Sequence, residues 1–149
     1  LDFEDESFDG GYSQHVTMNI KNRKEFFLEA YRVLKKGTFF AFSEHGLGPK
    51  GNPIFPLPWA DTSEMSFLLS PESTISLLKE IGFYDIQIIE TSEKYISGYE
   101  KMINTKSKKE IPILGIHVIG GVSMKQRSIN SMKSIKEKRT LPFEIVCKK

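Results

Sequence analysis

The chain has 149 residues, of which 39% are hydrophobic and 27% are charged, and its formal net charge is +2. This composition excludes global disorder, and no apolar run approaches the ~18 residues that a membrane-spanning helix needs. A single cysteine excludes an internal disulfide, and the acidic first residues are unlike a signal peptide, so we expect a cytoplasmic protein.

The first third of the chain predicts a strand, a helix and a second strand. Residues 8–16 are the first strand, although two glycines weaken it. Asn22 with Glu25 three residues later predicts a helix start, and Gly37 suits the position after the helix. Residues 38–42 form a nearly continuous apolar run, which is typical of a strand that is covered on both faces.

A loop rich in glycine and proline follows over residues 46–63. Loops longer than about 12–15 residues are uncommon and are often functional. This loop carries Phe55 and Trp59, which suit the wall of a pocket. Plain packing of the loop on the core explains the same aromatic residues equally well.

The rest of the chain continues the alternation of helices and strands. Ser70 before Pro71 predicts a helix that ends at Gly82, and residues 84–91 read as a strand. Further helices are predicted around residues 95–103 and from Ser123 onward, and residues 143–147 form a last strand that we expect to be antiparallel. This order predicts an α/β fold with helices on the faces of the sheet.

Three segments resemble the class I S-adenosylmethionine-dependent methyltransferases. Residues 3–9 (FEDESFD) resemble the PFEDxSFD segment that leads into the fourth strand of that family. Residues 32–37 (RVLKKG) resemble its RVLKPGG turn, and residues 80–83 (EIGF) resemble its AGF step before the sixth strand. In the turn, Lys36 replaces the proline of the family.

A narrower resemblance points to small-molecule methyltransferases of type 11, related to the ubiquinone/menaquinone and sarcosine/dimethylglycine enzymes. Residues 13–20 (SQHVTMNI) resemble the TQHVxMNI stretch of that group, and residues 55–60 (FPLPWA) resemble its FPVPWA loop. Residues 66–68 and 114–117 also match. The resemblance covers essentially the whole chain.

The resemblance implies the C-terminal half of a Rossmann-like methyltransferase sheet, with the equivalents of strands 4 to 7, flanking helices and a substrate-lid insertion. The glycine-rich GxGxG turn that binds the cofactor in this family does not occur in the sequence. We therefore expect residues 1–149 to be one truncated methyltransferase domain without that motif. Because that motif is missing, we expect cofactor binding and methyl transfer by this chain alone to be impaired.

The resemblance also assigns roles to particular residues. S-adenosylmethionine is the implied cofactor, with Ser13, Gln14 and Asn19 beside it and His15 as a catalytic base. The small-molecule acceptor would meet Glu44, His45, Phe55 and Trp59.

Each role has a simpler alternative that the sequence leaves open. His15 is equally explained as a buried, hydrogen-bonded histidine, Asn19 as a helix cap, and Glu44 as a solvated acid at a strand end. His117 fits a packing role better than a functional one. Histidines at positions 15, 45 and 117 with one cysteine give no metal-binding pattern.

Two functions from different classes follow. The chain is an enzyme that methylates a small molecule, or it is an inactive remnant that acts as a dimerising or partner-binding module. Half a sheet exposes the edge of its first strand and apolar faces, so we expect a homodimer.

Residues 1–100 carry 9 Lys and Arg against 16 Asp and Glu, whereas residues 101–149 carry 12 against 3. That asymmetry permits attraction within or between chains; nucleic-acid binding ranks last because no aromatic residues interleave with the basic ones.

Overall fold

The computed structural model describes residues 1–104 and 123–149. The described strands are β1 (Gly11–Gln14), β2 (Phe39–Leu47), β3 (Tyr84–Glu90) and β4 (Thr140–Lys148). The α-helices are α1 (Arg23–Val33), α2 (Pro71–Ile81), α3 (Ser92–Asn104) and α5 (Met124–Lys136), and two short 3₁₀ turns are η1 (Thr17–Asn19) and η2 (Ser63–Met65).

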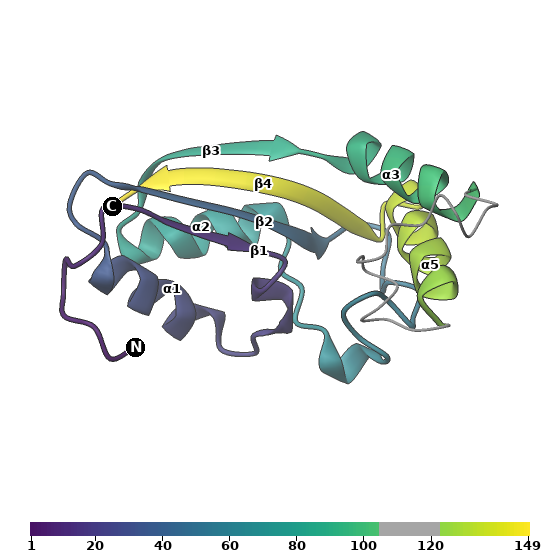
Figure 1. Ribbon diagram of the computed structural model, residues 1–149, viewed down its shortest axis with the longest axis horizontal. Coiled ribbons are helices and arrows are strands. Elements are labelled where there is room, and N and C mark those ends of the chain that lie inside the picture. Colours follow the sequence, from purple (N-terminus) through teal and green to yellow (C-terminus); the bar gives the residue numbers. More distant parts are fainter. Residues whose placement is uncertain (105–122) are drawn as a thin grey trace, which may run out of the picture.

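The four strands form one sheet in the order β1-β2-β4-β3. β1 and β2 are parallel, whereas β4 runs antiparallel to both β2 and β3. The long strand β4 therefore lies between two strands that precede it in the chain (Figure 1). The predicted α/β class and the antiparallel last strand are confirmed.

The helices begin and end where short polar residues and glycine predict. The Asn22 side chain accepts a hydrogen bond from the Glu25 backbone N–H, and the Ser70 side chain accepts one from the Ser73 N–H. Gly82 ends α2 in the left-handed conformation, with φ of 116°. These caps fix the first residues of α1 and α2 and so their register against the sheet.

One face of the sheet packs against α1 and α2. Phe40 and Phe42 point from β2 to this face, and Phe27 of α1 and Leu78 of α2 cover them. The ring of Phe27 lies 5.3 Å from that of Phe42, measured between centroids. Figure 1 shows both helices on the same side of the sheet. The hydrophobic core lies between these two layers.

The opposite face of the sheet has no helix over most of its area within the described residues. The outward side chains of Tyr12, Phe39 and Ile89 are 81%, 55% and 58% exposed. The expectation that residues 38–42 are covered on both faces is therefore wrong. The apolar run arises because Phe40 and Phe42 fill the core, while Phe39 and Ala41 lie on the other side of the pleat.

The first strand lies at one edge of the sheet, as expected, but it is shorter than predicted. Only residues 11–14 pair with β2, and Phe8 forms an isolated bridge to Leu34. The chain leaves the sheet at His15, whose φ is 53°, and turns into η1. The alternation of polar and apolar side chains along a strand does not show where the chain leaves the sheet.

Helices α3 and α5 pack against each other at the end of the sheet toward which β1 and β2 point (Figure 1). At this end β2 passes close to the turn before β4. A Cβ added to Gly48 would lie 2.2 Å from the Lys138 carbonyl oxygen, so only glycine fits there. The loop that follows runs beside α5.

Candidate functional site

A cleft of about 820 Å³ opens where the carboxyl ends of β1 and β2 meet α3, α5 and the proline-rich loop. Twelve described residues line it: His15, Met18, His45, Pro58, Trp59, Lys94, Tyr95, Gly98, Tyr99, Met102, Met124 and Arg127. The volume lies within the range of small-molecule sites, and the lining is mainly aromatic rings and methionines with a few polar groups.

His15 lies at the mouth of the cleft, directly after β1. Its backbone N–H donates to the Ser43 carbonyl at 2.9 Å, which holds the left-handed turn against β2. Its Nε2 atom lies 2.8 Å from the hydroxyl of Tyr95 on α3. Partial burial by these neighbours lowers the pKa of His15, although the residue stays accessible to solvent. The imidazole is therefore neutral at pH 7, which is the form that can accept a proton.

His45 lies deeper in the cleft and is only 2% exposed. Its ring stacks on Trp59 with centroids 4.6 Å apart and lies 5.7 Å from the ring of His15. Burial, followed by the nearby His15, lowers the pKa of His45 to about 3. Its Nδ1 atom is buried and has no hydrogen-bond partner within the described residues. An unpaired polar atom in a ligand-sized cleft can bond to a bound molecule.

Helix α5 anchors the loop that carries Trp59. Arg127 donates to the Leu57 carbonyl at 2.8 Å and pairs with Asp61, and Asn130 donates to the Pro56 carbonyl at 3.0 Å. At the other end, the Trp59 Nε1–H donates to the Ser66 hydroxyl at 3.0 Å. These contacts fix the indole as one wall of the cleft.

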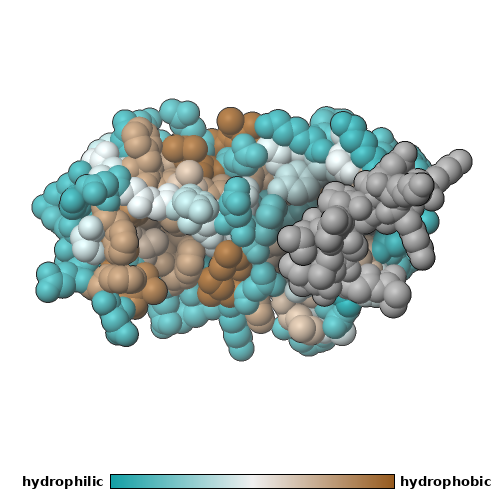
Figure 2. All heavy atoms as spheres, in the orientation of Figure 1, coloured by the Kyte–Doolittle hydropathy of each residue, from teal (hydrophilic) through white to brown (hydrophobic). Residues whose placement is uncertain are grey.

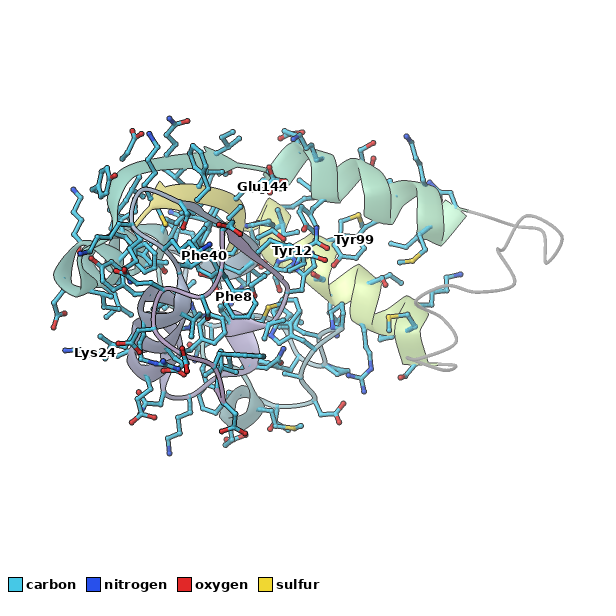
Figure 3. The ribbon with its side chains drawn as sticks, turned by 60° about the vertical axis from the view of Figure 1, so that its left-hand side comes forward. Phe8, Tyr12, Lys24, Phe40, Tyr99 and Glu144 are labelled. Atoms are coloured by element: carbon cyan, nitrogen blue, oxygen red, sulfur yellow. The ribbon has the colours of Figure 1, made fainter. Side chains whose placement is uncertain are left out.

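Tyr95 and Tyr99 form the wall on α3. Ser131 of α5 donates to the Tyr99 hydroxyl at 3.0 Å, and Figure 3 shows Tyr99 between the two helices. Burial raises the pKa of Tyr95 to about 12 and also raises that of Tyr99. Both phenols are therefore protonated and can donate hydrogen bonds. From the sequence, these tyrosines were predicted only to share one face of a helix. Their spacing of four residues is the signal that places both rings on that face.

Glu44 does not line the cleft, because neighbouring strand residues face opposite sides of the sheet. It is fully buried on the helix-covered face, 2.7 Å from Arg23, and accepts a hydrogen bond from Thr17. The alternative of a solvated acid at a strand end is wrong, since β2 continues to Leu47. Glu44 ties η1 and the start of α1 to the strand that carries His45.

The other predicted site residues lie near the cleft without lining it. Ser13 and Gln14 pair with Phe42 and Ser43 of β2, and the Asn19 side chain donates to the His15 carbonyl at 3.4 Å. Phe55 is half-buried in the loop before Trp59. The segment 114–117, with His117, lies outside the described residues.

The described residues contain no group of three or more His, Cys, Asp and Glu side chains placed to bind a metal ion. None of the helices in residues 1–104 and 123–149 combines the length and apolar character needed to cross a bilayer.

Residues 1–42 match the family described as Methyltransferase domain. A biotin biosynthesis bifunctional protein, BioHC, from Teredinibacter turnerae is 32% identical over 124 residues, which are 80% of this chain and 20% of that protein. The match over residues 1–42 agrees with the resemblance found in the sequence.

Solved structures share the fold of the whole chain. Phosphoethanolamine N-methyltransferase 2 from Haemonchus contortus, with S-adenosylhomocysteine, matches 99% of this chain and 35% of its own length, at 18% identity and a TM-score of 0.74. A Galdieria sulphuraria protein named as a sarcosine dimethylglycine methyltransferase matches 99% and 55%, at 17% identity and a TM-score of 0.76. The fold is that of the class I methyltransferases.

The predicted relationship to class I S-adenosylmethionine-dependent methyltransferases is confirmed. The chain spans about a third to a half of the two solved methyltransferases and a fifth of the bifunctional relative.

Open α/β folds of this kind bind ligands beyond the carboxyl ends of their strands. The cleft beside His15 and His45 occupies that position in this methyltransferase fold.

Proposed function

We propose that the chain forms the acceptor side of an S-adenosylmethionine-dependent methyltransferase site for a small molecule. The observation that carries the proposal is the cleft between the ends of β1 and β2 and the walls from α3 and the Trp59 loop. Its size suits a small molecule rather than a protein or nucleic-acid segment. The solved relatives are themselves named for small-molecule acceptors, which supports this choice.

The cofactor would bind beside the end of β1. Gln14 and Asn19 offer amide groups next to the mouth of the cleft, and these fit the polar end of an amino-acid moiety. Ser13 pairs with Phe42 and so faces the helix-covered side of the sheet, from which its hydroxyl would have to reach the cofactor. When bound, S-adenosylmethionine supplies an electrophilic methyl group on a sulfonium. The protein then has to align the acceptor and exclude water. Trp59, His45 and the α3 tyrosines do both, and Phe55 supports the loop.

His15 is the proposed catalytic base. It is neutral, it lies at the cleft, and Tyr95 holds its Nε2 atom at 2.8 Å. An acceptor O–H or N–H⁺ that loses its proton during methylation can pass it to the imidazole directly or through the Tyr95 hydroxyl. Glu44 acts as a positioning residue, because its pair with Arg23 holds the turn that follows His15.

Methionine NMR tests the proposal within one sample. The chain has five methionines; Met18, Met102 and Met124 line the cleft, whereas Met65 on η2 and Met132 do not. We expect S-adenosylhomocysteine to shift the ¹³C-methyl signals of the cleft methionines and to leave that of Met65 unchanged. Signals are assigned with single Met→Leu variants.

The outcome is specific to the site. Equal shifts at all five methionines, or none at millimolar ligand, would contradict the proposal. Trp59→Phe serves as a matched variant, because it keeps the loop apolar but removes the hydrogen bond to Ser66. It should weaken the ligand-induced shifts of Met18 and Met124, each measured against the ligand-free spectrum of the same variant.

A second candidate function rests on a different observation. β1 is an edge strand, and the sheet face beside it exposes Tyr12, Phe39 and Val146. Exposed edges and apolar sheet faces pair with other chains. We therefore propose, as the alternative, a catalytically inactive module that dimerises or binds a partner through this surface. A monomer by light scattering at micromolar concentration counts against it.

A further inference from the structure

The charged side chains that line the cleft are cations, although Glu144 of β4 lies near enough, from outside the lining, to add to burial in raising the pKa of Tyr95. The described lining of the cleft contains the cations Lys94 and Arg127 and no Asp or Glu. Arg127 is already engaged by Asp61 and by the Leu57 carbonyl. The two histidines are held neutral by burial. The charge left to meet a ligand is therefore that of Lys94.

No contact with the described residues explains the position of Lys94. It is exposed on the first turn of α3, one residue before Tyr95, and forms no ion pair within the described part of the chain. A cation in the first turn opposes the helix dipole, which favours negative charge there. An anion placed beside Lys94 would be stabilised by the ammonium group, whereas Glu93 in the same turn already complements the helix dipole.

The remainder of the cleft is apolar. Trp59 and Tyr99 supply flat faces, and Met18, Met102 and Met124 supply flexible apolar contacts. One buried polar atom, Nδ1 of His45, remains without a partner among the described residues. A ligand that fills this space combines an apolar body and one hydrogen-bonding group with a charged end.

We propose that the acceptor is an amphipathic organic anion, whose apolar or aromatic body lies between Trp59 and the α3 tyrosines and whose carboxylate or phosphate meets Lys94. The proposal rests on the proposed function for the statement that this ligand is the methyl acceptor. The binding preference itself does not depend on the cofactor.

Trp59 is the only tryptophan of the chain, so its fluorescence reports on this cleft. The test compares three probes with one phenylbutyl body, namely 4-phenylbutyrate, 4-phenylbutanol and 4-phenylbutylamine, excited at a wavelength that only tryptophan absorbs. We expect the carboxylate to bind at least about threefold more tightly than the alcohol at low salt, and the amine to bind most weakly. Added salt should reduce the preference for the carboxylate.

Lys94→Gln should abolish the preference for the carboxylate and leave the affinity for the alcohol unchanged. Lys125→Gln is the matched control, since Lys125 is exposed on α5 and does not line the cleft; it should behave as wild type. The circular dichroism spectra of both variants verify folding. Equal affinities for the three probes, no fluorescence response to any of them, or a preference that survives Lys94→Gln would overturn the proposal.

Failure here is distinguishable from failure of the proposed function. If S-adenosylhomocysteine shifts the cleft methionines while the three probes bind equally, the methyltransferase site stands and only the anionic acceptor is excluded. If phenylbutyrate binds as expected and S-adenosylhomocysteine does not, the cleft is an anion-binding site without methyl transfer.

Discussion

Glu44 and His45 are neighbours in sequence but serve opposite sides of the sheet. Glu44 is buried against Arg23 and Thr17 in the layer under the sheet, whereas His45 stacks on Trp59 in the cleft. Both residues follow an apolar run in the sequence, and both were predicted to contact the acceptor. The pleat of β2 separates them, and the extension of β2 to Leu47 determines which one faces the cleft.

Removing the buried carboxylate should destabilise the protein strongly. Glu44→Ala leaves the Arg23 guanidinium, 4% exposed, without its counter-charge, and breaking such a buried pair costs about 3–5 kcal/mol. Glu80→Ala is the control, because its pair with Lys24 has side chains 60% and 54% exposed and should change stability by less than about 1 kcal/mol. Urea denaturation measures both. Equal effects of the two variants would contradict the positioning role of Glu44.

His45 should make stability depend on pH. Its pKa is about 3 in the folded protein, against 6.5 in the unfolded chain. As pH falls from 6.5 toward 3, the unfolded state binds a proton that the folded state does not, so the free energy of unfolding falls by up to about 1.4 kcal/mol per pH unit. His15, whose pKa is also lowered, acts in the same direction.

Urea titrations at pH 7.5, 6.0 and 5.0, followed by Trp59 fluorescence, measure this dependence. His45→Gln should flatten the slope between pH 6.0 and 5.0 relative to wild type, since glutamine takes up no proton. A wild-type stability that stays constant or rises between pH 6.0 and 5.0 would show that His45 is not held neutral by burial.

At the scale of the elements, helices were easier to predict than strands. Asn22, Ser70 and Gly82 mark helix boundaries by local hydrogen bonds and backbone conformation, which depend on a few neighbouring residues. The ends of β1 and β2 depend on pairing with distant strands, and no local pattern encodes them. For the same reason the contact between Tyr95 and His15, 80 positions apart, was not predictable.

We predict that the protein self-associates through the edge strand β1. Tyr12 is 81% exposed beside the unpaired edge of β1, and Gln14 is also exposed. We expect a homodimer by light scattering at micromolar concentration, and Tyr12→Lys should shift it toward the monomer, because charge on an edge strand opposes pairing. Tyr84→Lys, on the opposite edge strand β3, is the control and should leave the dimer intact. A monomeric wild-type protein would contradict pairing through β1.

At the scale of the whole molecule, the acidic and basic parts of the chain contact each other. Arg127 pairs with Asp61, Lys136 with Glu100, and Lys148 with Asp85. The charge asymmetry of the sequence is thus partly neutralised within one chain. Figure 2 shows hydrophilic and hydrophobic residues interleaved over the face in view.

The fold class followed from the alternation of elements, and the site followed from family resemblance only in part. His15, His45 and Trp59, which the sequence singled out, line one cleft, and the roles assigned to them stay predictions. Lys94, Tyr95, Tyr99 and Arg127 were missed, because their contribution depends on how α3 and α5 pack over the strand ends. Such packing is a property of the assembled molecule and leaves little trace in local sequence.

Isothermal titration calorimetry of S-adenosylhomocysteine into the 149-residue chain tests whether the cleft belongs to a methyltransferase site. If the cleft is the acceptor side of a methyltransferase site, we expect saturable binding with one ligand per chain and a dissociation constant at or below about 1 mM. His15→Leu should weaken this binding, because it removes a polar group at the cleft mouth. The absence of both heat and thermal shift at millimolar ligand would contradict the claim and leave the edge-pairing module as the function to pursue.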